Sequence, residues 1–208
     1  MKISVYVTLV LLLIVSTASG AMMYTDEASF QAALDAGYYL EEFDAYNHWN
    51  EVSSPQSLGP VNGWEYDVSA STGSLWALAV YSGCLSTQYG DAVLTITFTG
   101  SQEVKTVGGH FFGSDWDGNV MSGMIHVELS DGTYDDYDST AGYFRGFTSS
   151  VPITSLSVSV PGATHDLNWP GPYPTVDHLY VGTPEPATLG LLVMGGLALL
   201  RRKRSTCS

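Results

Sequence analysis

Apolar and polar residues alternate along much of the middle of the chain. Residues 94–99 read Leu-Thr-Ile-Thr-Phe-Thr, so the apolar side chains share one face of a strand and the threonines share the other. Residues 125–129 and 156–160 alternate similarly, and Asp131-Gly132 is a strong hairpin signal leading into a strand at 133–137. By the same criteria we expect strands at residues 39–43, 64–68, 75–81, 104–112 and 176–181.

One helix is predicted before the first of these strands. Residues 24–27 offer helix-capping side chains and early negative charge. Phe30, Ala33 and Leu34 then form an apolar stripe at i, i+3 and i+4, and Gly37 is a typical residue for ending a helix. The sequence therefore predicts a single short helix near the N-terminus of the folded region.

The order of these elements favours an all-β fold. Short strands at regular spacing are separated by turn residues, and the chain contains 22 glycines. The helices that a parallel α/β fold needs between its strands are missing from the pattern. We therefore expect residues 21–182 to form one antiparallel β-sandwich, jelly-roll-like in topology, with the short N-terminal helix.

The first twenty residues have the pattern of a signal peptide. Met1-Lys2 is a short positive start, residues 3–15 are apolar, and residues 16–20 are small. We expect cleavage after Gly20, with Ala18 as the second choice. A transmembrane anchor is the less favoured alternative because the apolar run is short.

The C-terminus combines three features in a fixed order. Pro184-Glu185-Pro186 interrupts regular structure, and residues 187–200 are uncharged and largely apolar. At about 1.5 Å per residue this run reaches about 21 Å, less than a bilayer core of about 30 Å, so a buried core helix is the alternative. The terminal position and the basic cluster favour a transmembrane helix at 187–200 with the cluster on the cytoplasmic side. That cluster, the membrane stop signal, is Arg201, Arg202, Lys203 and Arg204.

This tail, residues 183–204, resembles the PEP-CTERM sorting signal, which is also catalogued as an ice-binding-protein C-terminal domain. The resemblance implies a Gram-negative exported protein whose tail, residues 183–208, is handled by an exosortase acting near Pro184-Glu185-Pro186. It implies membrane contact through the C-terminal helix before processing, and a final location in the envelope, at the cell surface or in the extracellular matrix. It implies neither ice binding nor any activity of the body.

A weaker resemblance covers the end of the body. Residues 144–147 and 152–160, followed by Val176-Asp177-His178-Leu179, look like the end of β-sandwich bodies that carry PEP-CTERM tails. In those bodies the last strand often has Asn where this chain has His178. The resemblance to lectin-like jelly rolls supports the fold more than any ligand.

The body is strongly acidic. Outside residues 21–182 lie five of the seven basic residues and one of the 21 acidic residues, so the body has a formal charge of 2 − 20 = −18. This charge disfavours binding to nucleic acid or to an anionic lipid surface, and it suits divalent cations or neutral sugars. The two cysteines, Cys84 and Cys207, provide no disulfide framework, and Cys84 is expected to be a buried apolar residue.

Two acidic segments are candidate calcium sites. Asp115, Asp117 and Asn119 place oxygen ligands in a glycine-containing loop, although the EF-hand pattern fails because Val120 and His126 occupy its glycine and glutamate positions. An acidic turn without metal is the alternative. The three aspartates at 135, 136 and 138 are expected to form a solvated strand edge, again with calcium as an alternative.

Catalytic motifs are absent from the sequence. The five histidines are scattered, and no zinc, nucleophile-elbow or phosphate-loop motif occurs. Glu41, Glu42 and Glu128 are the candidates for a glycosidase pair. Trp49 and Trp169 lie in polar loops and are candidates for stacking on a sugar ring. We therefore expect a non-catalytic polysaccharide- or matrix-binding module, with a structural biofilm component or a glycan hydrolase as alternatives.

Overall fold

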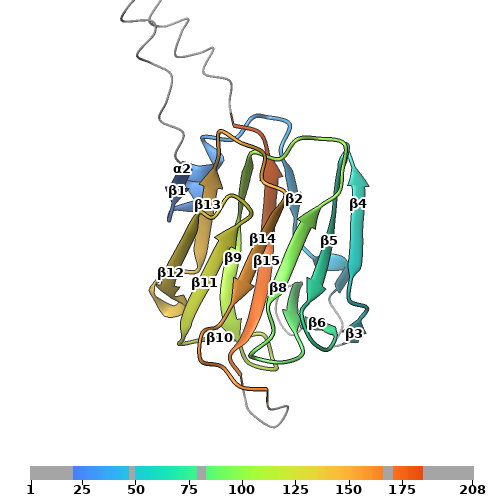
Figure 1. Ribbon diagram of the computed structural model, residues 1–208, viewed down its shortest axis with the longest axis vertical. Coiled ribbons are helices and arrows are strands. Elements are labelled where there is room, and N and C mark those ends of the chain that lie inside the picture. The colour runs from blue at the N-terminus through green and yellow to red at the C-terminus, as the bar shows by residue number, and fades with distance from the viewer. Residues whose placement is uncertain (1–20, 47–49, 79–82, 166–170, 185–208) are drawn as a thin grey trace, which may run out of the picture.

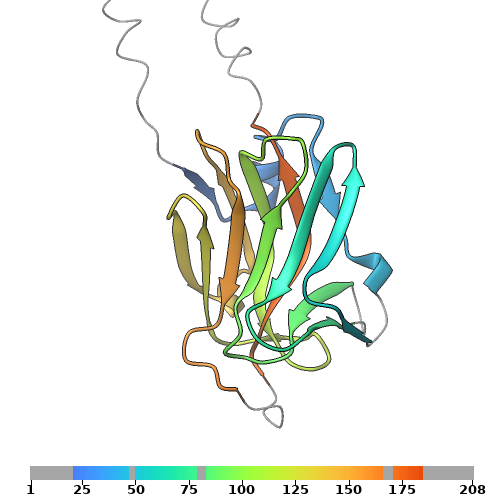
Figure 2. The same cartoon turned by 45° about the vertical axis from the view of Figure 1, so that its right-hand side comes forward.

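Two antiparallel sheets packed face to face make up the protein (Figures 1 and 2). The computed structural model describes residues 21–46, 50–78, 83–165 and 171–184. The nine-stranded sheet has the order β1 (Met22–Tyr24), β13 (Phe144–Thr148), β9 (Thr106–Ser114), β15 (Tyr173–Gly182), β7 (Cys84–Thr87), β6 (Leu75–Leu78) and β3 (Asn50–Val52), with β10 (Val120–Met121) paired to β9 and β2 (Tyr39–Glu41) paired to β15. The six-stranded sheet has the order β12 (Tyr134–Asp138), β11 (Met124–Leu129), β14 (Ser155–Ser159), β8 (Leu94–Phe98), β5 (Trp64–Ala70) and β4 (Gln56–Val61).

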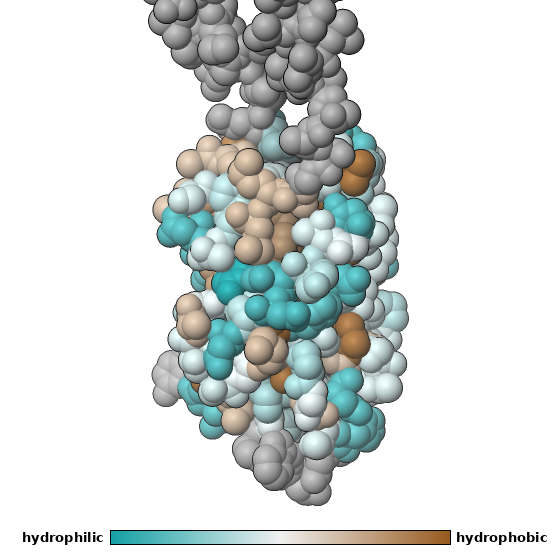
Figure 3. Space-filling model, turned by 60° about the vertical axis from the view of Figure 1, so that its left-hand side comes forward, coloured by the Kyte–Doolittle hydropathy of each residue, from teal (hydrophilic) through white to brown (hydrophobic). Residues whose placement is uncertain are grey.

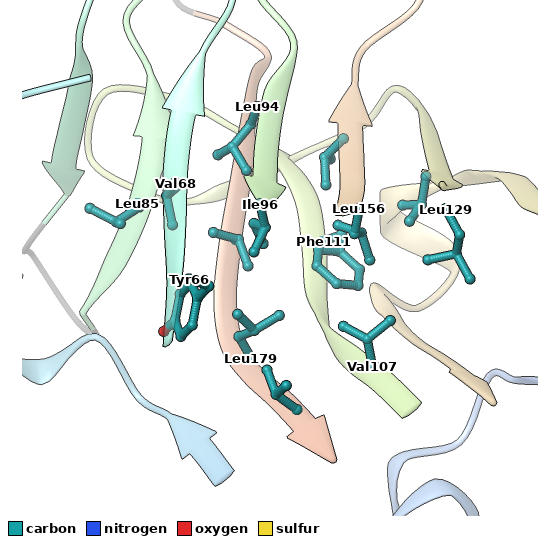
Figure 4. Close-up of a cluster of buried hydrophobic side chains, with 14 of the residues drawn as sticks. Tyr66, Val68, Leu85, Leu94, Ile96, Val107, Phe111, Leu129, Leu156 and Leu179 are labelled. Carbon is teal, nitrogen blue, oxygen red and sulfur yellow. The ribbon is translucent and has the colours of Figure 1, made fainter. Parts of the chain in front are cut away.

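The predicted all-β sandwich is therefore confirmed, and its core lies between the sheets. Figure 4 shows apolar side chains of both sheets pointing toward one another, among them Val107, Phe111 and Leu179 from the nine-stranded sheet and Ile96 and Leu156 from the six-stranded sheet. Strands β8, β11 and β14 alternate between buried and more exposed positions as the sequence predicts. Because their apolar residues face the core, the intervening polar residues form the outer face of the six-stranded sheet.

The predicted helix forms but is shorter than expected. Helix α2 spans Glu27–Gln31, and the side chain of its N-cap residue, Asp26, accepts a hydrogen bond from the Ser29 amide at 2.8 Å. The expectation that the helix runs on to Gly37 is wrong. The chain turns earlier because the Asp35 amide donates to the Thr183 carbonyl at 3.0 Å, which holds this segment against the end of β15.

Helix α2 lies on the outer side of the nine-stranded sheet, where two glycines make room for it. Gly108 and Gly146 face each other on β9 and β13. The fully buried ring of Phe30 lies over both, and a β-carbon added to Gly146 would be only 2.3 Å from it. A second apolar cluster forms here, outside the main core. Its buried members are Phe30, Leu34, Phe144 and Tyr180.

Strand β7 escaped the sequence prediction because it lacks alternation, and all four of its residues are buried. Strands β9 and β15 were predicted, and nearly all of their residues are buried, so both faces of these strands are covered. Strand β15 begins at Tyr173, earlier than residue 176, where the sequence predicts the start of the last strand. The short strands β1, β3 and β4, together with β13, were also not expected.

Both ends of the described chain lie at the same end of the sandwich (Figure 1). Leu34 and Pro184 form a bridge there, so the start of the C-terminal tail is attached to the folded body. Figure 3 shows apolar surface gathered toward that end and a hydrophilic band below it. Within the described residues, no helix is long and apolar enough to cross a membrane. The predicted signal peptide and C-terminal helix lie outside the described residues.

Candidate functional site

Two histidines and an aspartate meet on the outer side of the nine-stranded sheet. His110 in the middle of β9 lies directly opposite Asp177 on β15. Immediately after Asp177 the register shifts, and His178 takes a left-handed backbone conformation with φ of 49°. Such a bulge adds a residue to one strand and changes where its side chain points. It therefore brings His178 next to Asp177 and His110, and the two imidazole rings lie 5.0 Å apart.

The polar atoms of these three residues are close enough to share a ligand. One nitrogen of each histidine and one carboxylate oxygen of Asp177 all lie within 4.8 Å of one another. The Nδ1 atom of His178 is 2.8 Å from the Asp177 Oδ1 atom. That contact lacks hydrogen-bond geometry, so this buried nitrogen has no hydrogen-bond partner among the described residues. The Asp177 Oδ1 atom instead accepts a hydrogen bond from the His178 amide at 2.7 Å.

Helix α2 adds a second carboxylate. The Glu27 Oε2 atom is 3.2 Å from the His110 Nε2 atom, and the Tyr180 hydroxyl donates to the other Glu27 oxygen. Burial acts to raise the pKa of Glu27, but the hydrogen bonds from Tyr180 and His110 outweigh it, so this pKa lies below its ordinary value. Glu27 is therefore an anion at neutral pH. We call Glu27, His110, Asp177 and His178 the histidine cluster.

The predicted calcium loop joins β9 to β10. The Asp115 Oδ1 atom accepts hydrogen bonds from the Asp117 and Asn119 amides, each at 2.9 Å. The Asn119 side chain also donates to the Asp115 Oδ2 atom at 3.0 Å. The three residues share one loop, and these hydrogen bonds link Asp115 to Asp117 and Asn119. Calcium binding at this loop stays a prediction.

The outer face of the six-stranded sheet carries short hydroxyl side chains in register. Ser157 on β14 lies opposite Thr95 on β8, and Thr95 lies opposite Ser69 on β5. On the other side Ser157 lies opposite Glu128 on β11, which lies opposite Tyr134 on β12. One row of outward-facing side chains thus crosses five strands. We call the following outward hydroxyl residues the hydroxyl face: Ser69, Thr95, Thr97, Ser155, Ser157 and Ser159.

An aromatic and acidic edge borders the hydroxyl face. The Tyr134 side chain is 60% exposed, and its ring lies 5.5 Å from the His126 ring. The His126 Nδ1 atom is 2.7 Å from the Asp136 Oδ1 atom, and its Nε2 atom is 3.6 Å from a Glu128 oxygen. The hydrogen bond with Asp136, assisted by Glu128, raises the pKa of His126 against the effect of burial.

The three neighbouring aspartates of β12 play different parts. Asp136 and Asp138 are exposed on an edge strand, which agrees with the expected solvated edge. Asp135 points the other way and accepts a hydrogen bond from the Arg145 Nε atom at 2.5 Å. Sequence reasoning missed this ion pair because its partner lies on the other sheet. The guanidinium also lies 3.5 Å above the Tyr137 ring.

The remaining site residues predicted from the sequence either lie apart from one another or fall outside the described residues. Trp49 and Trp169, the sugar-stacking candidates, lie outside the described residues, as do Glu185, Pro186 and the basic cluster. Glu41 on β2 accepts hydrogen bonds from the Tyr39 and Tyr66 hydroxyls at 2.6 and 3.2 Å. Glu128 is exposed on the outer face of the six-stranded sheet, whereas Glu41 contacts the fully buried Tyr66, so these two glutamates do not form a pair.

Residues 183–204 match the family model described as the PEP-CTERM protein-sorting motif. The chain is a PEP-CTERM sorting-domain protein. The match begins at Thr183, directly after β15 ends at Gly182, so the sorting domain starts where the sandwich stops. A search of curated proteins found no match to this chain.

The sorting domain determines where the PEP-CTERM protein is sent. Such a tail is the substrate signal of an exosortase, and it directs export across the inner membrane to the cell envelope of a Gram-negative bacterium. The body of the protein is therefore located outside the cytoplasm.

Proposed function

We propose that residues 21–182 form a non-catalytic module that binds neutral polysaccharide at the cell surface or in the extracellular matrix. The observation that carries this proposal is the hydroxyl face, where donors and acceptors repeat in register across neighbouring strands. Neighbouring strands are about 4.8 Å apart, so the row from Ser69 to Tyr134 presents a polar group at each step over about 19 Å. An extended chain of sugars has hydroxyls along its whole length and suits such a surface.

Charge supports a neutral ligand rather than an anionic one. Glu128, Asp136 and Asp67 point outward beside the hydroxyls, and Lys and Arg side chains are absent from the described strands of this face. Carboxylates accept hydrogen bonds from sugar hydroxyls and repel uronic acids or sulfated sugars. The exposed Tyr134 ring at one end of the row provides a surface on which a sugar ring stacks.

The test is affinity electrophoresis of the full chain in mild detergent, through gels that contain neutral polysaccharides. A Ser157→Arg variant places a long cationic side chain in the middle of the row, and we expect it to lose at least about tenfold in affinity. The matched control is Ser101→Arg, which adds the same charge at an exposed loop residue. We expect the control to bind like the wild type.

Three other outcomes would contradict polysaccharide binding at the hydroxyl face. Equal loss of binding in both arginine variants would mean that charge, not the hydroxyl face, governs retention. Binding to no polysaccharide, accompanied by self-assembly of the protein, would favour the structural biofilm alternative. Release of sugar fragments that disappears in a Glu128→Gln variant would favour the hydrolase alternative.

A further inference from the structure

The histidine cluster has a charge that its surroundings do not balance. Asp177 is 7% exposed, and the Glu27 carboxylate lies 3.2 Å from the His110 imidazole. Within the described residues, the two Lys and Arg side chains are both engaged elsewhere, Lys105 with Glu103 and Arg145 with Asp135. A buried carboxylate without a counter-charge is strongly unfavourable. A cation shared between the histidines and the carboxylates would offset this charge.

The cluster also contains a buried imidazole nitrogen that makes no hydrogen bond. The Nδ1 atom of His178 is buried without a hydrogen-bond partner among the described residues, although it lies 2.8 Å from Asp177. The backbone adopts an unusual left-handed conformation to place this ring there. A metal ion bound between the His178 nitrogen and the Asp177 oxygen would give this nitrogen a partner.

We propose that His110, Asp177 and His178 bind a transition-metal ion of the zinc type, with Glu27 as the supporting carboxylate. This inference goes beyond polysaccharide binding and rests on the opposite sheet. Two imidazoles and a carboxylate are the ligands that Zn²⁺ prefers, at about 2.0–2.2 Å each. Calcium is disfavoured because it requires six to eight oxygen ligands.

The geometry fits an ion of that size. Ligand atoms about 2.1 Å from a tetrahedral ion are about 3.4 Å apart. The cluster atoms lie within 4.8 Å of one another, so small rotations of the rings suffice to bring them to this spacing. Glu27 contacts His110 at 3.2 Å, the arrangement in which a carboxylate orients a metal-binding imidazole. The side chains of His110 and His178 are 17% and 33% exposed, which leaves a route for the ion from solvent.

The bound ion has a structural consequence for the N-terminal segment. His110 lies on β9, Asp177 and His178 lie on β15, and Glu27 begins α2. A metal at this point links the two central strands of the nine-stranded sheet, and it fixes the helix through the Glu27–His110 contact. The metal therefore stabilises the folded state, because the unfolded chain does not hold these ligands together.

The test measures metal binding by the full chain, purified in mild detergent without a histidine tag. We expect isothermal titration with ZnCl₂ to show one ion per chain. We expect the melting temperature to rise by about 5–10 °C when free Zn²⁺ is about 100 times its dissociation constant. Addition of Co²⁺ should give the visible absorption of a cation bound by nitrogen ligands. CaCl₂ should produce none of these effects at the cluster.

Variants separate this site from other cation binding. His178→Asn removes the imidazole while keeping a residue that tolerates the left-handed backbone, and it should weaken zinc binding at least about 100-fold. Glu27→Gln should weaken zinc binding about tenfold at unchanged stoichiometry. The matched control is His126→Asn, which removes the histidine paired with Asp136 and Glu128 on the other sheet.

The results that overturn the proposal are specific. Absence of Zn²⁺ and Co²⁺ binding by the wild-type chain would contradict it, and this result does not depend on the folding of any variant. Zinc binding that survives in His178→Asn and disappears in His126→Asn would place the metal on the other sheet. A calcium response that is lost in an Asp115→Asn variant would report on the β9–β10 loop and not on the histidine cluster.

Discussion

Replacing Arg145 by methionine is expected to lower the free energy of unfolding by about 3 kcal/mol. Arg145 lies on β13 in one sheet, and its guanidinium bonds Asp135 and covers the Tyr137 ring on β12 in the other sheet. It also donates to the carbonyls of Gly142 and Phe144 at 3.0 and 2.7 Å. Methionine keeps much of the apolar stem but leaves Asp135 without its counter-charge. Urea denaturation followed by tryptophan fluorescence measures the change.

The body provides its own control for this prediction. Among Lys and Arg side chains of the described residues, Lys105 makes the other ion pair, 3.0 Å from Glu103, and the two side chains are 30% and 55% exposed. A Lys105→Met variant should therefore change the free energy of unfolding by less than about 1 kcal/mol. Similar losses in the two variants would mean that Arg145 contributes only surface charge.

A Gly146→Ala variant is expected to lose about 2–3 kcal/mol of unfolding free energy. The new β-carbon would lie 2.3 Å from the Phe30 Cδ2 atom and 2.7 Å from its Cγ atom. The Phe30 ring cannot turn away easily because the rings of Tyr24, Phe144 and Tyr180 surround it. Helix α2 must therefore shift outward, which also separates Glu27 from His110. Denaturation curves give the energy, and hydrogen exchange at residues 27–31 reports the shift.

Two further variants test whether the loss comes from the clash with Phe30. Gly37→Ala is the matched control, because an added β-carbon there meets nothing within 4 Å, and its effect should stay within about 0.5 kcal/mol. In a Phe30→Ala background the Gly146→Ala change should cost much less, since the clash is gone. An equal cost in both backgrounds would show that Phe30 does not rest on Gly146.

Strands with alternating apolar and polar residues were predictable because one of their faces is exposed to solvent. In β8, β11 and β14 every second residue is apolar, so the sequence alone indicates which side chains enter the core. Strand β7 has no such pattern, because it is covered on both sides. Its sequence, Cys-Leu-Ser-Thr, is short and shows no alternation of apolar and polar residues, so periodicity does not mark it as a strand.

The histidine cluster could not be predicted from sequence spacing. His110 and Asp177 are far apart along the chain and meet only because β9 and β15 are neighbours in the sheet. His178 joins them through a bulge, which shifts its side chain out of the simple alternation of a strand. One local feature of the sequence pointed to this cluster. Similar bodies often have Asn at the position that His178 occupies in this chain. The sorting tail, in contrast, was predictable because its three features are contiguous.

The most direct test of the account asks where the body is found in intact cells. We propose that residues 187–204 hold the exported protein at the membrane until an exosortase processes it. Full-length protein and a variant lacking residues 187–204 would be compared by cell fractionation, with an impermeant label to detect exposed body. We predict that the full-length protein is recovered from the envelope and that the variant is released into the medium. Retention of the variant in the membrane fraction, or a body that stays in the cytoplasm, would contradict the account.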